Sequence, residues 1–218
     1  GSMHVLQAAR HAGARRVVLS SSCAVYGDAG AAVDESAATS PISPYAASKL
    51  AMEQAAQMTS LAFGLSTVIL RYFNVYGPRQ APDSPYAAAI PIFIDTMLAG
   101  NAPVIFGDGQ QTRDFVFVDD VASANLLASE VEVEPGAVFN IGSGRSVTIV
   151  ELVAALRALF PGIPEPSFGP VRTGDIRHSA GRIARAGQAL SYRPETALSD
   201  GLAATVEWVR GSLQGSPS

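Results

Sequence analysis

The chain has 218 residues, 48% of them hydrophobic, and a formal net charge of −4 at neutral pH. This length can bury one core with a small appended lobe, and the negative balance argues against a broad nucleic-acid surface. A single cysteine excludes an internal disulfide framework, and the three histidines are scattered along the sequence rather than spaced as metal ligands. The sequence shows no signal peptide and no long apolar span, so we expect a cytoplasmic protein with no membrane partner.

Helix-like and strand-like hydrophobic patterns alternate along the chain, which is typical of an α/β fold. The expected helices cover 3–12, 44–63, 89–99, 119–130, 148–160 and 198–212, and the expected strands cover 16–20, 66–71, 104–106, 113–117 and 137–141. The Gly-Asp-Gly sequence at 107–109 on its own indicates a hairpin between two of these strands.

Three serines lie at the C-terminal end of the first expected strand. The run Val17–Leu19 is short, apolar and β-branched, as in a buried parallel strand. Ser20, Ser21 and Ser22 come directly after it, at the end of the strand where open α/β sheets place their ligand crevice. Serine is also an ordinary loop residue, so the cluster alone is a weak signal.

The only lysine of the chain, Lys49, lies four residues after Tyr45. Ser43 and Pro44 predict a helix start just before them, and residues four apart share one face of a helix. A nearby ammonium favours the phenolate form of a tyrosine, so the pair predicts a general base that deprotonates an alcohol. The alternative is a solvated lysine beside a surface tyrosine.

These two motifs and the segment 71–80 together resemble the extended short-chain dehydrogenase/reductase superfamily, specifically its nucleotide-sugar epimerases and dehydratases. The resemblance runs from the first residues to about Trp208. It implies the C-terminal part of a Rossmann-like parallel sheet flanked by helices, plus a small α/β substrate-binding lobe. The expected division is 1–80 for the remaining half of the NAD-binding domain (returning near 110–145), 81–210 mainly for the substrate-binding lobe, and 211–218 for a disordered tail.

Members of this family begin with a strand, a Gly-x-x-Gly-x-x-Gly turn and a helix that hold the pyrophosphate of a dinucleotide. The printed sequence contains no such segment, so we expect a chain truncated at its N-terminus and inactive alone. The glycine turn within 139–147 lacks the third glycine and lies far downstream, so we do not assign it to the cofactor.

The resemblance also implies functional residues. The catalytic set is Ser22, Tyr45 and Lys49; the NAD-binding set is Ser20, Tyr45, Lys49 and Tyr72; and the substrate-binding set is Asn74, Phe106, Arg113, Arg172, Asp175 and Ser179. In this scheme the two arginines bind the diphosphate, the phenylalanine packs on the base and the aspartate binds a ribose hydroxyl. A surface salt bridge for Arg113 and a turn cap for Asn74 are the structural alternatives.

The reaction class depends on the residues after Ser22. Dehydratases of the family carry an Asp-Glu pair there, whereas this chain has Cys23 and Ala24. The remaining set suffices for reversible oxidation at a sugar carbon, and the resemblance therefore implies an NAD-dependent 4-epimerase of UDP-hexoses or UDP-N-acetylhexosamines. Ser179, seven residues after Arg172, is small enough to admit an acetamido group. Another oxidoreductase of the family and an inactive sugar-nucleotide-binding fragment stay open.

Family members dimerise through two helices that form a four-helix bundle across the interface. The corresponding segments here are 3–12 and 44–63, so the resemblance implies a homodimer through these helices.

Overall fold

The structure is a computed structural model that describes residues 1–30, 32–80, 89–172 and 176–214. Its helices are α1 (Ser2–His11), η1 (Cys23–Tyr26, a 3-10 turn), α2 (Pro44–Phe63), α3 (Ala89–Leu98), α4 (Val118–Glu130), α5 (Ile149–Arg157), α6 (Ala184–Leu190) and α7 (Leu198–Gln214). Its strands are β1 (Arg16–Ser22), β2 (Ala32–Val33), β3 (Ser66–Tyr72), β4 (Asn74–Tyr76), β5 (Val104–Phe106), β6 (Thr112–Arg113), β7 (Phe115–Phe117), β8 (Ala137–Ile141), β9 (Val147–Thr148), β10 (Ser167–Gly169) and β11 (His178–Gly181).

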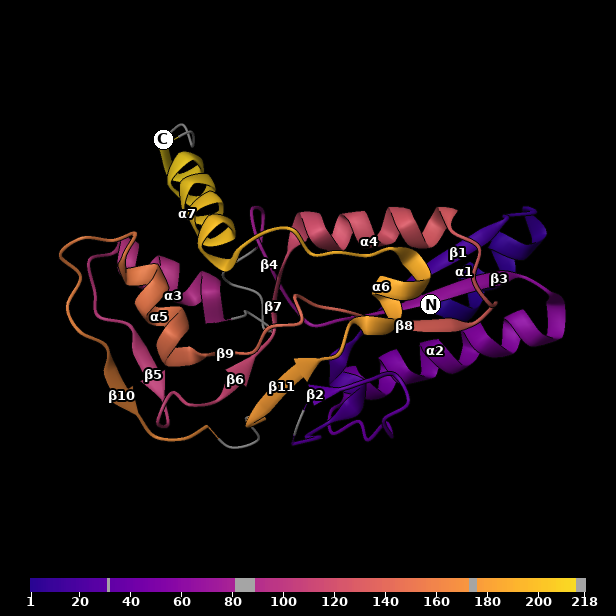
Figure 1. Ribbon diagram of the computed structural model, residues 1–218, viewed down its shortest axis with the longest axis horizontal. Coiled ribbons are helices and arrows are strands. Elements are labelled where there is room, and N and C mark those ends of the chain that lie inside the picture. Colours follow the sequence, from indigo (N-terminus) through magenta and orange to yellow (C-terminus); the bar gives the residue numbers. More distant parts are fainter. Residues whose placement is uncertain (31, 81–88, 173–175, 215–218) are drawn as a thin grey trace.

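The predicted α/β fold is confirmed by a parallel sheet of β1, β3 and β8, in that order, between two layers of helices (Figure 1). Alternate residues of the central strand β3 face opposite layers. Ile69 packs with Leu6 of α1 and Ala56 of α2, whereas Leu70 faces the α4 and α6 side. All of these side chains are buried, which explains why β3 reads as a continuous apolar run.

Helix α2 begins and ends where local sequence signals place it. The Ser43 side chain accepts a hydrogen bond from the Ala46 amide (3.1 Å), and Pro44 occupies the first turn, where its missing N–H costs nothing. Gly64 ends the helix in the left-handed conformation (φ 73°). The predicted helix over 44–63 is therefore confirmed, with Tyr45 in its first turn.

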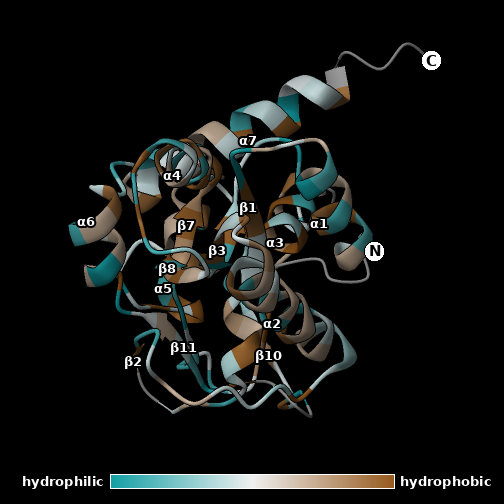
Figure 2. Cartoon of the chain, turned by 90° about the vertical axis from the view of Figure 1, so that its right-hand side faces the viewer, coloured by the Kyte–Doolittle hydropathy of each residue, from teal (hydrophilic) through white to brown (hydrophobic). Residues whose placement is uncertain are grey.

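A second hydrophobic core joins α3, α5 and α7, which lie together at the left of Figure 1. Ile94, Leu152 and Leu202, one from each helix, are fully buried in it. Figure 2 shows the same principle for the molecule as a whole, with hydrophobic colour concentrated among the strands and on the inner faces of the surrounding helices. Within the described residues no helix has the length and apolarity that crossing a bilayer requires.

Three expectations need correction. The strand expected over 113–117 is interrupted at Asp114 into β6 and β7. The hairpin expected at 107–109 does not form, because β5 pairs with β10 while β6 pairs with β9 and β11. Helix α7 continues to Gln214, so 211–214 are helical rather than part of a disordered tail, and 215–218 lie outside the described residues.

Candidate active site

The C-terminal end of β1 and the first turns of α2 meet at the candidate catalytic residues. The Ser22 hydroxyl accepts a hydrogen bond from the Ala24 amide (3.2 Å) and caps η1. The Lys49 ammonium donates to the backbone carbonyl of Ser20 (2.7 Å) and lies 5.6 Å from the centre of the Tyr45 ring. The helix therefore brings the tyrosine and lysine to the strand end that bears the serines.

A cavity of about 480 Å³ opens beside these residues. Its described lining is Ser22, Cys23, Ala24, Gly27, Tyr45, Phe73, Asn74, Arg113, Ile176 and Ser179. Five of the residues predicted from the sequence are thus brought to one cavity from β1, α2, β4, β6 and β11. Lys49 is not among the lining residues, but it lies beside the cavity through its contacts with the Tyr45 ring and the Ser20 carbonyl.

Cys23 follows Ser22 directly and lines the same cavity. Its Sγ lies 3.8 Å from the hydroxyl of Ser179 on β11, so the two residues form one corner of the cavity. Burial raises the pKa of the Cys23 thiol, which keeps it neutral in this corner. Within the part of the chain that the structure describes, no three His, Cys, Asp or Glu side chains come together as they would to hold a metal ion.

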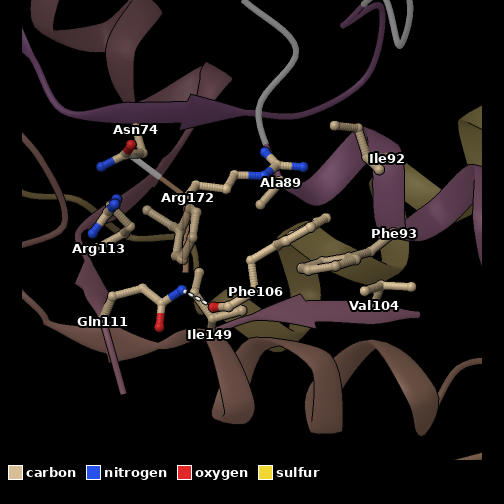
Figure 3. Close-up of a pocket in the computed structure, with 11 residues that line it drawn as sticks. Asn74, Ala89, Ile92, Phe93, Val104, Phe106, Gln111, Arg113, Ile149 and Arg172 are labelled. Carbon is tan, nitrogen blue, oxygen red and sulfur yellow. Dashed lines mark hydrogen bonds between the residues drawn. The ribbon is translucent and has the colours of Figure 1, made fainter. Parts of the chain in front are cut away.

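A second cavity, of about 270 Å³, adjoins the first (Figure 3). Its lining is Asn74, Ala89, Ile92, Phe93, Val104, Phe106, Gln111, Arg113, Phe115, Ile149 and Arg172. Figure 3 shows Asn74 and Arg113 at one end and the rings of Phe93 and Phe106 at the other. The Arg172 guanidinium lies 3.9 Å from the centre of the Phe106 ring. Asn74 and Arg113 line both cavities, so the two cavities lie side by side and share these two residues.

Asp114, which no sequence motif marked, holds two residues that line the cavities, Asn74 and Ser179. Its carbonyl oxygen accepts hydrogen bonds from the backbone amide (2.9 Å) and side chain (3.1 Å) of Asn74, and its amide donates to the Ser179 carbonyl (2.8 Å). Its buried carboxylate accepts from the amides of Ser143 (2.7 Å) and Gly144 (3.1 Å). These two amides of the downstream glycine turn therefore find their hydrogen-bond acceptor within the protein.

Ser20 and Tyr72, both predicted to bind cofactor, also lie together. Their hydroxyls are 3.0 Å apart, and the Tyr72 hydroxyl donates to the side chain of Asn125 on α4 (2.9 Å). No sequence motif marked Asn125, because an asparagine within a helix carries no distinctive spacing. Asp175 lies outside the described residues.

Comparison with known proteins agrees with the site. The chain is 40% identical over 216 residues to the UDP-glucose 4-epimerase of Mycolicibacterium smegmatis, covering 98% of this chain and 68% of that protein. The solved structure of a UDP-N-acetylglucosamine 4-epimerase from Methanobrevibacter ruminantium M1 in complex with UDP-N-acetylmuramic acid superposes with a TM-score of 0.92 at 38% identity, covering 97% of this chain and 68% of that one.

A UDP-glucuronic acid 4-epimerase from Bacillus cereus, in complex with UDP-glucuronic acid and NAD, superposes with a TM-score of 0.87 at 32% identity, covering 97% of this chain and 66% of that one. The chain therefore spans about two thirds of the length of these relatives. Residues 1–142 match the NAD dependent epimerase/dehydratase family. Together with the high identity to epimerases along nearly the whole chain, this match shows that the protein belongs to the NAD dependent epimerase/dehydratase family.

Proposed function

We propose that this chain forms the catalytic and substrate-binding part of an NAD-dependent nucleotide-sugar 4-epimerase that acts on UDP-hexoses or UDP-N-acetylhexosamines through a 4-keto intermediate. The observation that supports this most directly is that the two cavities adjoin and share two lining residues. Ser22 and Tyr45 line the first, and Asn74 and Arg113 connect it to the second. A sugar beside the tyrosine can therefore extend through a diphosphate to a base.

The charges and surfaces of the second cavity suit a nucleoside diphosphate. Arginine presents several N–H donors to phosphate oxygens, and Arg113 and Arg172 both line this cavity. The Phe106 ring is proposed to pack on the base. The Arg172 guanidinium covers one face of this ring in the structure (3.9 Å to the ring centre), so the base would take that place when Arg172 turns to the diphosphate. Asn74 completes the connection by donating to the sugar or phosphate oxygens, and Asp175 is proposed to bind a ribose hydroxyl.

The nicotinamide-ribose end of NAD fits the residues around β1. Ser20 is exposed, and the Lys49 ammonium has three donors, of which one binds the Ser20 carbonyl. We propose that Lys49, Tyr45, Ser20 and Tyr72 hold this end of the cofactor, which supplies the hydride acceptor and donor when bound. The printed sequence holds no Gly-x-x-Gly-x-x-Gly turn, and we assign none of its residues to the pyrophosphate.

The chain's own residues handle the proton. Tyr45, as phenolate, takes the proton of the sugar 4-hydroxyl, and Ser22 hydrogen-bonds the same oxygen as the carbonyl forms. Lys49 stabilises the phenolate from behind the ring. Rotation of the keto sugar within the cavity presents its other face for reduction, after which Tyr45 returns the proton. Arg113 and Arg172 retain the diphosphate throughout this rotation.

The absence of a carboxylate favours epimerisation over dehydration. Elimination of water needs an additional acid and base, and none of the described residues that line the first cavity is Asp or Glu. Cys23 follows Ser22, at the position where the resemblance implies a carboxylate in dehydratases. Burial raises the pKa of its thiol and so keeps it neutral.

Assembly and domain division complete the proposal. Several large apolar side chains are exposed on α1 and α2, namely Met3, Val5, Met58, Leu61 and Phe63. Their burial against a second copy would remove them from water, so we propose a homodimer through these two helices. We propose that the segments 1–80 and 110–145 form the cofactor-binding half. The helices α3, α5 and α7, which share one core, are proposed to form the substrate-binding lobe.

The activity is tested by joining the chain to the N-terminal segment that the 4-epimerase relatives possess and following UDP-glucose by proton NMR. We expect conversion to UDP-galactose, and we expect Tyr45→Phe to lower kcat by about 10²–10⁴-fold with little change in substrate affinity. Tyr192→Phe is the matched control, because the Tyr192 hydroxyl binds the Gly142 carbonyl (2.9 Å) in the core.

Other outcomes select the alternatives. A net change in free NADH during turnover would identify another oxidoreductase of the family. Calorimetric binding of a UDP-sugar without any turnover would identify an inactive sugar-nucleotide-binding fragment. Retention of half the wild-type rate by Tyr45→Phe would refute the assignment of the base.

A further inference from the structure

A buried ion pair lies directly beneath the candidate catalytic residues. Glu53 of α2 and Arg71 of β3 are 2% and 5% exposed. The Glu53 carboxylate accepts from Nε (2.9 Å) and Nη2 (2.6 Å) of Arg71. Charged side chains are rarely buried this fully, because removing them from water is costly unless their geometry is well satisfied.

Glu53 follows the catalytic pair along the same helix. Tyr45, Lys49 and Glu53 are spaced by four residues, so all three lie on the face of α2 that looks toward β1. The first two reach the cavity and the end of the strand, whereas Glu53 reaches under the strand to the sheet. Because the three residues belong to one helix, holding Glu53 in place also holds Tyr45 and Lys49 at their positions along the helix axis.

Glu53 also binds β1 itself. Its carboxylate accepts a hydrogen bond from the buried hydroxyl of Ser21 (2.5 Å). Ser21 lies between Ser20, whose carbonyl binds Lys49, and Ser22, which lines the cavity. Successive side chains of a strand point to opposite faces, so Ser21 points toward Glu53 while the side chains of Ser20 and Ser22 point to the other face. The hydrogen bond to Ser21 therefore fixes the backbone that carries both neighbours.

The other half of the pair holds the turn that follows β1. The Arg71 guanidinium lies 4.7 Å from the centre of the Tyr26 ring in η1, and the Tyr26 hydroxyl donates to Asn140 of β8 (2.7 Å). One buried ion pair thus contacts β1, η1, α2 and β3, the elements that carry or support Ser20, Ser22, Tyr45 and Lys49.

We infer that Glu53 and Arg71 are positioning residues, and that the bond from Glu53 to Ser21 sets the distance between the Tyr45–Lys49 pair and the serine-bearing end of β1. The inference rests on the proposed function only for the part that Tyr45 and Lys49 play in turnover. The geometry itself predicts a property of the free protein, namely how firmly the Lys49 ammonium is held on the Ser20 carbonyl.

This property can be measured because Lys49 is the only lysine of the chain. Its acetylation rate by an N-hydroxysuccinimide ester, followed by peptide mass spectrometry at fixed pH, reports how far the amine is protected by its hydrogen bond. We expect Glu53→Gln and Ser21→Ala to raise this rate about fivefold, as loss of one hydrogen bond would. Ser21→Ala keeps the ion pair and tests the link to β1 even where Glu53→Gln fails to fold.

Thr67→Val is the matched control. Thr67 of β3 is fully buried and its hydroxyl lies 2.7 Å from that of Ser60 on α2. It therefore joins α2 to β3, as the ion pair does, but at the end away from the cavity and without contact to Ser21 of β1. We expect this variant to lose thermal stability without any change in the acetylation rate. An unchanged rate in Ser21→Ala, or an equal increase in Thr67→Val, would overturn the inference. Neither result involves substrate, so both are distinguishable from a failure of the proposed epimerase activity.

Discussion

Replacing Ser179 by tyrosine should narrow the substrate range of the proposed enzyme. Ser179 lies on β11 and lines the sugar cavity, and its hydroxyl is 3.8 Å from the Cys23 Sγ. A larger side chain cannot extend toward the cysteine at that distance. A phenol at position 179 must instead project into the cavity of about 480 Å³, where it competes with the substrate for space.

The size of the effect follows from the cost of steric overlap. Forcing additional atoms into a packed site costs roughly 1–3 kcal/mol, which corresponds to a loss of about 5–150-fold in affinity. We expect a loss of this size for UDP-N-acetylglucosamine, whose acetamido group needs the space. UDP-glucose carries only a hydroxyl at that carbon, and we expect its affinity to change by less than about threefold.

Isothermal titration of both nucleotide sugars into wild type, Ser179→Tyr and Ser179→Ala gives the required comparison. Ser179→Ala removes the hydroxyl without adding volume, so it should bind both sugars as the wild type does. The reasoning would be refuted if wild type ignored the acetylated sugar, if Ser179→Tyr bound both sugars with unchanged affinity, or if Ser179→Ala showed the same selectivity as Ser179→Tyr.

Three further predictions concern an exposed ion pair, the buried cysteine and the proposed dimer. Hydrogen bonds from Arg177 hold the pKa of Asp108 at about 2. The stabilising contribution of this exposed pair is therefore present above the ordinary aspartate pKa and is lost as the pH falls toward 2. An NMR titration of Asp108 should show a midpoint at about 2, and Arg177→Gln should raise this midpoint. Because burial raises the pKa of Cys23, its alkylation by iodoacetamide at pH 8 should be about tenfold slower than that of a free thiol. A bound UDP-sugar should slow the alkylation further. An alkylation rate equal to that of free cysteine would contradict this prediction. Sedimentation at micromolar concentration should show a dimer, and Met58→Glu on the exposed face of α2 should yield monomers; a wild-type monomer would exclude the proposed interface.

Local signals in the sequence determined the elements that bear the proposed base. Ser43 and Pro44 place the start of α2 and Gly64 its end, since capping and the left-handed conformation depend only on adjacent residues. Helical periodicity then places Tyr45 and Lys49 on one face without any tertiary information. The apolar run before the serines likewise predicted β1, and the structure extends this strand through Ser22.

Tertiary structure alone decided how distant segments meet. The strands β6, β9 and β11 have two to four residues each, too few for a hydrophobic period to mark them. Their pairing places Ser179 beside Cys23, 156 residues away in the chain, and the interruption at Asp114 that joins Asn74 to Ser179 arises from hydrogen bonds between segments. The ion pair of Glu53 and Arg71 also could not be predicted from the sequence, because it depends on how two distant elements pack. A glutamate one turn after Lys49 is typical of a solvated helix face, and only the packing of α2 against β3 buries it. Sequence patterns record which face of an element is apolar, whereas the partner of each polar group is chosen when the elements pack.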